Sequence, residues 1–379
     1  MSFLGLQNDQ GQPTNPMPPP YSKLKYAHNP FPGLGTVNSS VSVPRPEAKS
    51  LGTALQHFLT DPAATGSMWV VEADTGIGKS NFLSSIEHEV KSAQANGLLA
   101  GVHCLYKQSQ PVSGPQLVET VVHLLGREQL NQLLQQGPDI PALPPHVRGT
   151  ELDHFLDSLR RRMPGMGSDS DTGFLLRWLS GAQTTTAERQ RYHINSRDKL
   201  VPAVALPYLR ILFLLLREAK LCTKLLLLLD EFEDVLTVSR TTQNEYVTAL
   251  KGLFNLFNGD GLFIVLSGQP QAVLSVGSKV PSLDSRWEKV SLRPIERSQD
   301  AVLLAQAYMR AAHDQYLALH GTSGHGVDIS ELFPSEDLIK SVFVTLREAN
   351  PAEFVTQRNL LAELHNRIDR HVQQLSLKA

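Results

Sequence analysis

The sequence predicts an α/β protein in which a parallel sheet precedes a helical C-terminal unit. Short apolar stretches at 68–71, 225–229 and 262–266 alternate with longer segments whose apolar residues recur every three to four positions. Such alternation is typical of parallel strands joined by crossover helices. The stretch 225–229 is all leucine, which predicts a strand buried on both faces. From residue 300 to the end of the sequence the spacing is helical.

Each element follows from local spacing and from the residues that interrupt it. Leucines recur every fourth residue at 51–59, and an apolar run at 68–71 ends in a glycine-rich turn before a helical face at 80–90. Prolines interrupt the chain at 138–145, and a Gly, Ser and Asp loop covers 163–172. The predicted strands are 68–71, 98–106, 225–229, 262–267 and 287–292. The predicted helices are 50–59, 80–90, 117–125, 130–134, 152–162, 174–179, 204–218, 245–257, 300–319, 336–347 and 353–375.

Composition narrows the class of protein. A chain of 379 residues with 41% hydrophobic content has room for two to three compact units. The formal net charge of −2 excludes a globally basic nucleic-acid coat but allows a local basic stripe. Two isolated cysteines, Cys104 and Cys222, exclude a disulfide scaffold and a cysteine-based zinc site. The N-terminus lacks the pattern of a secretory signal and the apolar runs are short, so we expect a soluble, cytoplasmic protein without a membrane partner.

The domain organisation is predicted from changes in composition. Residues 1–27 are rich in Pro, Gly, Asn and Ser, which predicts a flexible tail. The segment 29–33, Asn-Pro-Phe-Pro-Gly, is expected to dock on the domain that follows it. That domain is predicted to cover 28–295 and a helical lid 296–379. Between the strands near 100 and 225 the chain is too long for a simple crossover, which predicts a mostly helical insertion at about 105–220.

A candidate phosphate loop lies between the first strand and the helix that follows it. Residues 73–80 read Ala-Asp-Thr-Gly-Ile-Gly-Lys-Ser, which matches G-x-x-x-x-G-K-[ST] except at Ala73. Gly76 and Gly78 allow the backbone to wrap around a phosphate, Lys79 would reach the β and γ phosphates, and the Ser80 hydroxyl would ligate Mg²⁺. The alternative is a glycine-rich turn without a ligand. The predicted nucleotide contacts are Asp74, Thr75, Gly76, Ile77, Gly78, Lys79, Ser80 and Asn81.

Two acidic residues directly follow the all-leucine strand. Because ligands of open parallel sheets lie beyond the carboxyl ends of the strands, Asp230 and Glu231 are expected to face the phosphate site. Asp230 would hold the water shell of Mg²⁺, and Glu231 would orient or deprotonate the attacking water. The alternative is a solvated acidic turn that also contains Glu233 and Asp234.

Further candidates follow the later strands. Ser267 and Gln269 compete for contact with the γ-phosphate or the attacking water, and a plain turn is an equal alternative. Arg286 would reach the nucleotide of a neighbouring subunit, or else pack on Trp287 as a surface residue. The candidate catalytic residues are therefore Glu231, Lys79, Arg286 and Ser267.

A locally basic region lies in the insertion. It contains Arg160–Arg162 and the residues Arg189, Arg191, His193, Arg197 and Lys199. A contact to a nucleic-acid backbone is one interpretation, and solvated helix faces are the favoured one.

Together these motifs resemble those of AAA+-type ATPases in the origin-recognition, transposon-targeting and STAND-like branch. The resemblance rests on Asn-Pro-Phe at 29–31, the loop at 73–80, Leu-Leu-Leu-Asp-Glu at 227–231, Ser-Gly-Gln at 267–269, Arg286-Trp287 and the helical tail. The segment 176–181, Leu-Arg-Trp-Leu-Ser-Gly, is similar to the ATP-binding proteins of BREX-like phage-defence systems. The lid differs, because Ala349-Asn350-Pro351-Ala352 stands where this family often has Gly-Asn-Pro-Arg, and only Arg358 offers a nearby substitute.

The resemblance implies an oligomeric, Mg²⁺-dependent ATPase that is coupled to DNA or to an effector protein, in a bacterial anti-phage system. Two other interpretations stay open, namely a slow nucleotide switch or scaffold that recruits an effector, and a DNA-bound ATPase of the transposon-targeting or replication kind. A small-molecule kinase or a GTPase is disfavoured, because an Asp-Glu pair suits water activation and no Asn-Lys-x-Asp motif is present.

Overall fold

The computed structural model describes residues 20–33, 41–43, 45–162, 169–195, 200–257, 259–279, 284–320 and 331–377. Their contacts divide the chain into two compact units. The sheet unit comprises Arg45–Thr75 and Lys79–Arg293. The remaining described residues, Gly76–Gly78 among them, group in the C-terminal unit.

The sheet unit is built on a sheet of five parallel strands in the order β2-β3-β4-β1-β5. Every predicted strand is present, and β3 is buried along its whole length, as its leucines predicted. The strand predicted from residue 98 begins only at Val102, because the preceding residues form a turn with positive φ at Gly97 and Gly101. The strands are β1 (Met68–Glu72), β2 (Val102–Lys107), β3 (Lys224–Leu229), β4 (Leu262–Gly268) and β5 (Trp287–Ser291).

The register of the sheet decides which loops meet. Strand β4 lies between β1 and β3, with Glu72 opposite Gly268 and Leu229 opposite Leu266. The carboxyl ends of these strands therefore share one edge of the sheet. At that edge the loop after β1, the acidic pair after β3 and the polar residues after β4 come together.

Most helices of the sheet unit agree with the predicted ones, with several differences. Helix α6 begins at Asp169, inside the segment 163–172 that was predicted as a loop, and α7 was not predicted. Helix α9 begins five residues earlier than predicted, and α10 was not predicted. The α-helices are α1 (Lys49–Thr60), α2 (Lys79–Ala95), α3 (Gly114–Leu125), α4 (Arg127–Gln135), α5 (Glu151–Arg160), α6 (Asp169–Leu179), α7 (Thr186–Arg191), α8 (Pro202–Glu218), α9 (Arg240–Phe257) and α10 (Pro270–Lys279). Short 3₁₀ helices are η2 (Pro46–Ala48), η3 (Gly137–Asp139), η4 (Pro145–Val147) and η5 (Phe232–Leu236).

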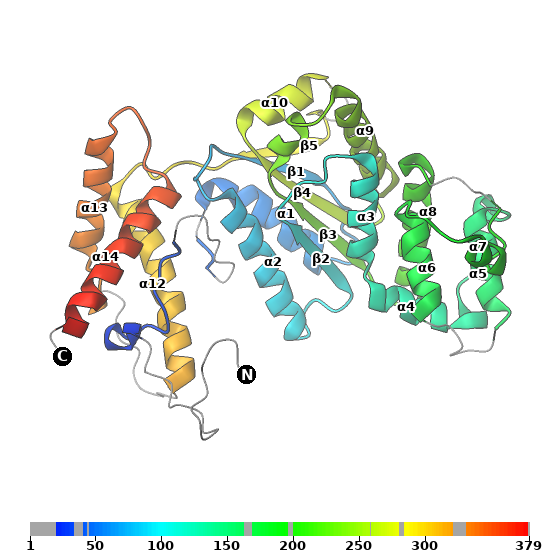
Figure 1. Cartoon of the computed structure of the whole chain (residues 1–379), viewed down its shortest axis with the longest axis horizontal. Coiled ribbons are helices and arrows are strands. Elements are labelled where there is room, and N and C mark those ends of the chain that lie inside the picture. The colour runs from blue at the N-terminus through cyan, green and yellow to red at the C-terminus, as the bar shows by residue number, and fades with distance from the viewer. Residues whose placement is uncertain are drawn as a thin grey trace. The chain divides into compact units, whose positions relative to one another are not determined.

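The predicted helical insertion is present as α3–α8, between β2 and β3. In Figure 1 the helices α4–α8 gather on one side of the sheet. They share one continuous hydrophobic core with the strands, which runs from Met68 and Leu227 in the sheet through Leu212 to Phe155 and Phe174. The insertion is thus an extension of the sheet's own core.

The C-terminal unit contains the predicted long helices α12 (Ser298–His320), α13 (Glu336–Ala349) and α14 (Gln357–Leu377), together with η1 (Pro20–Leu24). Their shared core is formed by apolar residues of the three helices and by Tyr26, Phe31 and Val41. Among the described residues, no helix is long and apolar enough to cross a membrane.

Two predictions about the N-terminal segment are wrong. Residues 20–27, assigned to a flexible tail, fold onto the C-terminal helices, and Tyr26 is fully buried there. The segment 29–33, expected to dock on the domain that follows it, packs on α14 instead: Asn29 donates to Asp369 (2.8 Å), and Nδ1 of His365 lies 2.7 Å from the Phe31 carbonyl. The aromatic rings gain burial from whichever apolar groove accepts them, and composition does not say which groove that is. Residues 1–19 of the predicted tail lie outside the described part.

Candidate active site

The loop between β1 and α2 has the backbone that its glycines predicted. Gly76 (φ 83°) and Gly78 (φ 106°) have positive φ angles, which side-chain-bearing residues rarely adopt. The N–H of Ala73 donates to the Gly268 carbonyl (3.1 Å), which fixes the start of the loop against β4. Helix α2 begins at Lys79, so the N-terminus of a helix follows the loop directly.

Lys79 is held within this loop. Its side chain is 8% exposed, and its ammonium donates to the carbonyls of Ala73 (2.7 Å) and Asp74 (3.4 Å). Ala73, where the motif has its first glycine, thus contributes a carbonyl rather than a side chain. These contacts keep a positive charge at the loop, where an anionic ligand would meet it.

Asp230 is the most constrained acidic residue of the site. It is fully buried, and its Oδ1 accepts hydrogen bonds from the Ser267 hydroxyl and from the N–H of Glu231 (2.9 Å). The sheet register explains the first bond, because Ser267 is the next residue along β4 after the Leu229–Leu266 pair. These two hydrogen bonds fix the direction of the carboxylate.

Tyr106 is a site residue that the sequence interpretation missed. Its hydroxyl donates to Oδ2 of Asp230 (3.1 Å). It lies near the end of β2, whose carboxyl end meets the same edge as that of β3. The available signal was its position as the last residue of the predicted strand 98–106.

Glu231 turns the chain away from β3. Its backbone is left-handed (φ 57°, ψ 46°), a conformation that costs a non-glycine residue roughly 1–2 kcal/mol. Burial raises the pKa of its carboxyl above the ordinary value, and the carboxylates of Asp234, Asp230 and Glu233 add to this effect, while Lys79 opposes it. A strained, half-buried carboxylate near a lysine is typical of a functional site.

The turn after Glu231 packs closely on β4. A Cβ added at Gly268 would lie 2.8 Å from Cβ of Phe232, so glycine is needed at this position. This contact fixes the acidic turn against the end of the strand.

The two competing residues after β4 have different environments. Ser267 is fully buried and faces Asp230. Gln269 is half-buried; its side-chain amide donates to the Thr75 hydroxyl (3.2 Å), and its N–H donates to Glu233 (3.0 Å). Gln269 thereby links the loop after β1 to the acidic turn, whereas Ser267 orients Asp230.

The other predicted site residues lie in or beside these elements. In the loop, Asp74 and Thr75 are exposed and Ile77 is buried. Ser80 is half-buried and Asn81 buried in the first turn of α2. Arg286 is exposed in the turn before β5, and the cation over the Trp287 ring is Lys289, at 5.9 Å. The alternative in which Arg286 covers Trp287 is therefore not supported.

Several arginines of the predicted basic region take part in ion pairs within the insertion. Arg162 donates twice to the buried Asp171 (3.0 Å each), which also accepts from Tyr192 (2.5 Å) and lies 3.5 Å from Arg191. Arg160 donates to Asp157 (2.9 Å). These contacts favour the structural interpretation over a nucleic-acid surface. Arg197 and Lys199 lie outside the described residues.

The residues present fit a magnesium ion held mainly by water and phosphate. Among the described residues no group of three or more His, Cys, Asp or Glu side chains is arranged to hold a metal. Mg²⁺ bound with nucleotide usually keeps several waters and takes only one or two protein ligands. The Ser80 hydroxyl and the fixed carboxylate of Asp230 meet that requirement.

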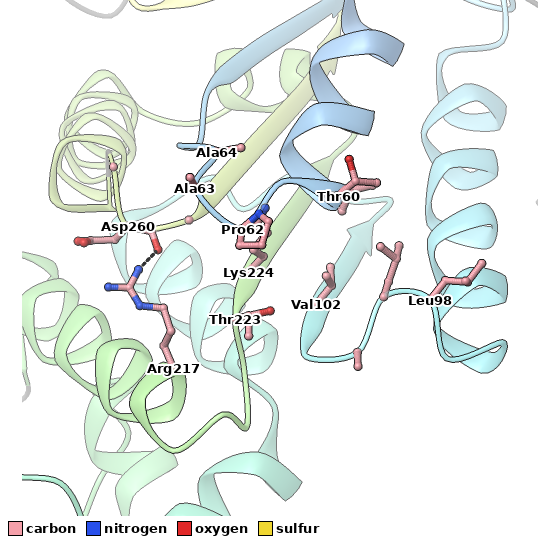
Figure 2. A pocket seen from close by; sticks show the side chains of 15 residues that line it. Thr60, Pro62, Ala63, Ala64, Leu98, Val102, Arg217, Thr223, Lys224 and Asp260 are labelled. Carbon is pink, nitrogen blue, oxygen red and sulfur yellow. Dashed lines mark hydrogen bonds between the residues drawn. The ribbon is translucent and has the colours of Figure 1, made fainter.

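A separate pocket lies at the opposite edge of the sheet, where β2 and β3 begin (Figure 2). Its volume is about 440 Å³, and it is lined by Leu59, Thr60, Pro62, Ala63, Ala64, Leu98, Leu99, Ala100, Val102, Arg217, Thr223, Lys224, Gly259, Asp260 and Gly261. Its two cationic side chains form hydrogen bonds with backbone carbonyls. Arg217 donates to the Asp260 carbonyl (2.8 Å), and Lys224 donates to the carbonyls of Phe58 and Asp61. The pocket is distant in the fold from the loop after β1, so it is not the nucleotide site.

Lys224 supports the end of α1, which gives a stability prediction. The residue is 6% exposed, and its ammonium donates to the carbonyls of Phe58, in the last turn of the helix, and of Asp61, which follows the helix. It also lies 4.9 Å from the Phe58 ring centre. Replacement Lys224→Met keeps the apolar length but leaves buried carbonyls without a donor, so we expect a loss of about 1–3 kcal/mol in unfolding free energy. Denaturant unfolding measures it, with the exposed Lys220→Met as the control. Equal stability of both variants would contradict this role.

The strand order and the glycine loop after β1 together define the fold. The chain has an α/β fold of the P-loop NTPase kind, with a helical C-terminal unit.

Neither a protein-family model nor a curated protein matches the sequence. Among solved structures, the chain is similar to the Aeropyrum pernix ORC2 protein in its ADPNP–ADP complexes, with 13% identity and a TM-score of 0.42 over 88% of this chain and 70% of that chain. It is similar to the ADP form of ORC2, with 13% identity and a TM-score of 0.40 over 91% of this chain and 72% of that chain. It is also similar to Drosophila ORC bound to DNA, with 11% identity and a TM-score of 0.39 over 97% of this chain and 68% of that chain. These similarities are weak, and the fold assignment rests on the strand order and loop geometry.

Proposed function

We propose that this protein is a Mg²⁺-dependent ATPase that converts ATP to ADP and phosphate. The observation that carries the proposal is the meeting of three features at one edge of the sheet. These are the glycine loop with its buried Lys79, the Asp230–Glu231 pair, and Gln269, which bonds both the loop and the acidic turn. This combination supplies donors for phosphate, an oriented carboxylate and a base.

The roles follow from the contacts of each side chain. The loop amides and Lys79 would bind the β and γ phosphates, and Ser80 would ligate Mg²⁺ with Asp230 holding its water shell. Mg²⁺, when bound, neutralises charge between the β and γ phosphates. Glu231 would orient the attacking water and accept its proton. The Ser267 hydroxyl would orient Asp230 through its hydrogen bond to Oδ1. Gln269 is the polar side chain after β4 that reaches the loop, where it donates to Thr75.

The finer assignment rests on the sequence resemblance. We place the activity in an oligomer that is coupled to DNA or an effector protein, in bacterial anti-phage defence. The exposed Arg286 would then complete a neighbouring subunit's site, where it stabilises charge in the transition state. A transposon-targeting or replication-type ATPase bound to DNA uses the same site.

A slow nucleotide switch or scaffold is the second candidate. The observation that favours it is the engagement of Ser267 with Asp230, which removes Ser267 from contact with the γ-phosphate. The lid segment 349–352 also lacks the arginine that the resembled family often carries. Such a protein would bind ATP tightly, hydrolyse it slowly and recruit its effector in the bound state.

ATP turnover by the purified protein, with and without duplex DNA, separates these functions. Turnover that requires Mg²⁺ and rises with DNA is expected for the DNA-coupled ATPase. Binding with negligible turnover in both conditions supports the switch. Absence of both binding and turnover would contradict the proposed function.

A further inference from the structure

We infer that Tyr106 is a positioning residue that fixes the Asp230 carboxylate for magnesium binding. The inference rests on the proposed function and deepens it, since it identifies what sets the metal requirement of the same site. It follows from the hydrogen bonds of Asp230, from the anchoring of Tyr106 and from the freedom that the carboxylate would gain without it.

The first step is the number of acceptor positions on Asp230. An ionised carboxylate offers about four lone pairs. Two on Oδ1 are used by the Ser267 hydroxyl and the Glu231 N–H, and one on Oδ2 is used by Tyr106. One position on Oδ2 is left, which suits a single hydrogen bond from a metal-bound water.

The second step is the rigidity of Tyr106. Tyr106 is paired with Leu228 in the sheet. Its backbone N–H donates to the carboxylate of Glu87 (3.2 Å) on α2, the helix that begins at Lys79. The pairing continues past β3, since the N–H of Asp230 donates to the Lys107 carbonyl (3.0 Å). The phenol is thus attached to both the helix and the strand end that form the site.

The third step is the state of the phenol. The hydroxyl of a tyrosine ordinarily has a pKa of about 10. The hydroxyl therefore remains a donor at neutral pH.

Without the Tyr106 hydroxyl, Oδ2 of Asp230 would have no hydrogen-bond donor to hold it in place. Ser267 and the Glu231 N–H hold only Oδ1, and rotation about the terminal torsion of aspartate is broad. Oδ2 would then present its acceptor positions in several directions. Residues that orient metal ligands typically change metal affinity by about 10–100-fold when removed. For a contact through water we expect the lower end of this range.

The test compares Tyr106→Phe with the matched control Tyr192→Phe. Both remove one hydroxyl that donates to a buried aspartate, one in the site and one in the insertion. Binding of a fluorescent, non-hydrolysable ATP analogue is measured at equilibrium, in EDTA and across a Mg²⁺ titration, with thermal unfolding of each variant. We expect Tyr106→Phe to raise the Mg²⁺ concentration for half-maximal enhancement of binding about 10-fold. Binding in EDTA should change less than about twofold, and Tyr192→Phe should match the wild type.

The outcomes are distinguishable. An unchanged Mg²⁺ requirement in Tyr106→Phe overturns the inference and leaves the proposed function intact, as does an equal rise in Tyr192→Phe. Weaker binding in EDTA to the same degree as in Mg²⁺ shows a general structural effect and also overturns it. If the wild type does not bind the nucleotide, the proposed function fails together with the inference.

Discussion

Glu231→Gln is expected to lower ATP turnover by about 100-fold or more, while nucleotide affinity changes only a few-fold. General bases contribute about 10²–10⁴-fold to rate, and the amide keeps the size of the side chain but cannot accept a proton. Phosphate contacts come from the loop and Lys79, so binding should persist. Single-turnover hydrolysis and equilibrium binding of the nucleotide measure the two effects separately.

The pH dependence of turnover provides a second readout for Glu231. Burial, with the neighbouring carboxylates, raises the pKa of this carboxyl. A base must be ionised, so activity should fall as the pH drops through a value above the ordinary glutamate pKa. We expect this acidic limb to disappear from the residual activity of Glu231→Gln.

Glu233→Gln is the matched control, because it makes the same chemical change two residues away. The carboxylate of Glu233 accepts the N–H of Gln269 and has a structural role in the acidic turn. Its replacement should reduce turnover less than about tenfold. Equal losses in the two variants would assign the effect to the turn as a whole and remove Glu231 from its proposed role.

Lys79→Ala is expected to have the other large effect, on both nucleotide affinity and turnover. The ammonium is held at the loop by the carbonyls of Ala73 and Asp74 and lies where the phosphates would bind. Removal of one such electrostatic contact typically costs about 10²–10³-fold in rate. Titration with ATP and steady-state hydrolysis measure the loss.

The control for this variant is Lys91→Ala on the same helix. Lys91 is exposed, and its i,i+4 pair with the partly buried Glu87 is a contact along one helix that typically contributes about 0.2–0.5 kcal/mol. We expect near-normal binding and turnover for Lys91→Ala. Hydrolysis that survives Lys79→Ala at the wild-type rate would reject the ATPase proposal.

Much of the sheet was predictable because its signals are local. The all-leucine run before Asp230 predicts a buried strand, and the glycines at 76 and 78 require the positive φ angles that are observed. Helix α10 was not predicted, since the residues 270–279 combine proline, glycine and few periodic apolar positions. The helix is set instead by its packing against η5 and β1.

The N-terminal segment shows a different limit. Tyr26 and Phe31 are separated by turn residues, and their sequence contains no periodic pattern that identifies a partner. The segment is held by residues more than 330 positions away, since His365 contacts the Phe31 carbonyl and Asp369 accepts a hydrogen bond from Asn29. The basic region was also not interpretable from sequence alone. Only the structure shows that Arg162 and Arg191 form ion pairs with the buried Asp171.

Local sequence was enough to predict the strands, the glycine loop after β1 and the acidic pair, because backbone freedom, helix termini and apolar runs are properties of neighbouring residues. The tertiary structure decided which polar residues act on one another. Strand order and register bring Ser267 and Tyr106, from β4 and β2, to the two oxygens of Asp230, and they leave Gln269 to reach Thr75. These contacts join residues far apart in the chain, and such pairs are fixed only when the sheet assembles.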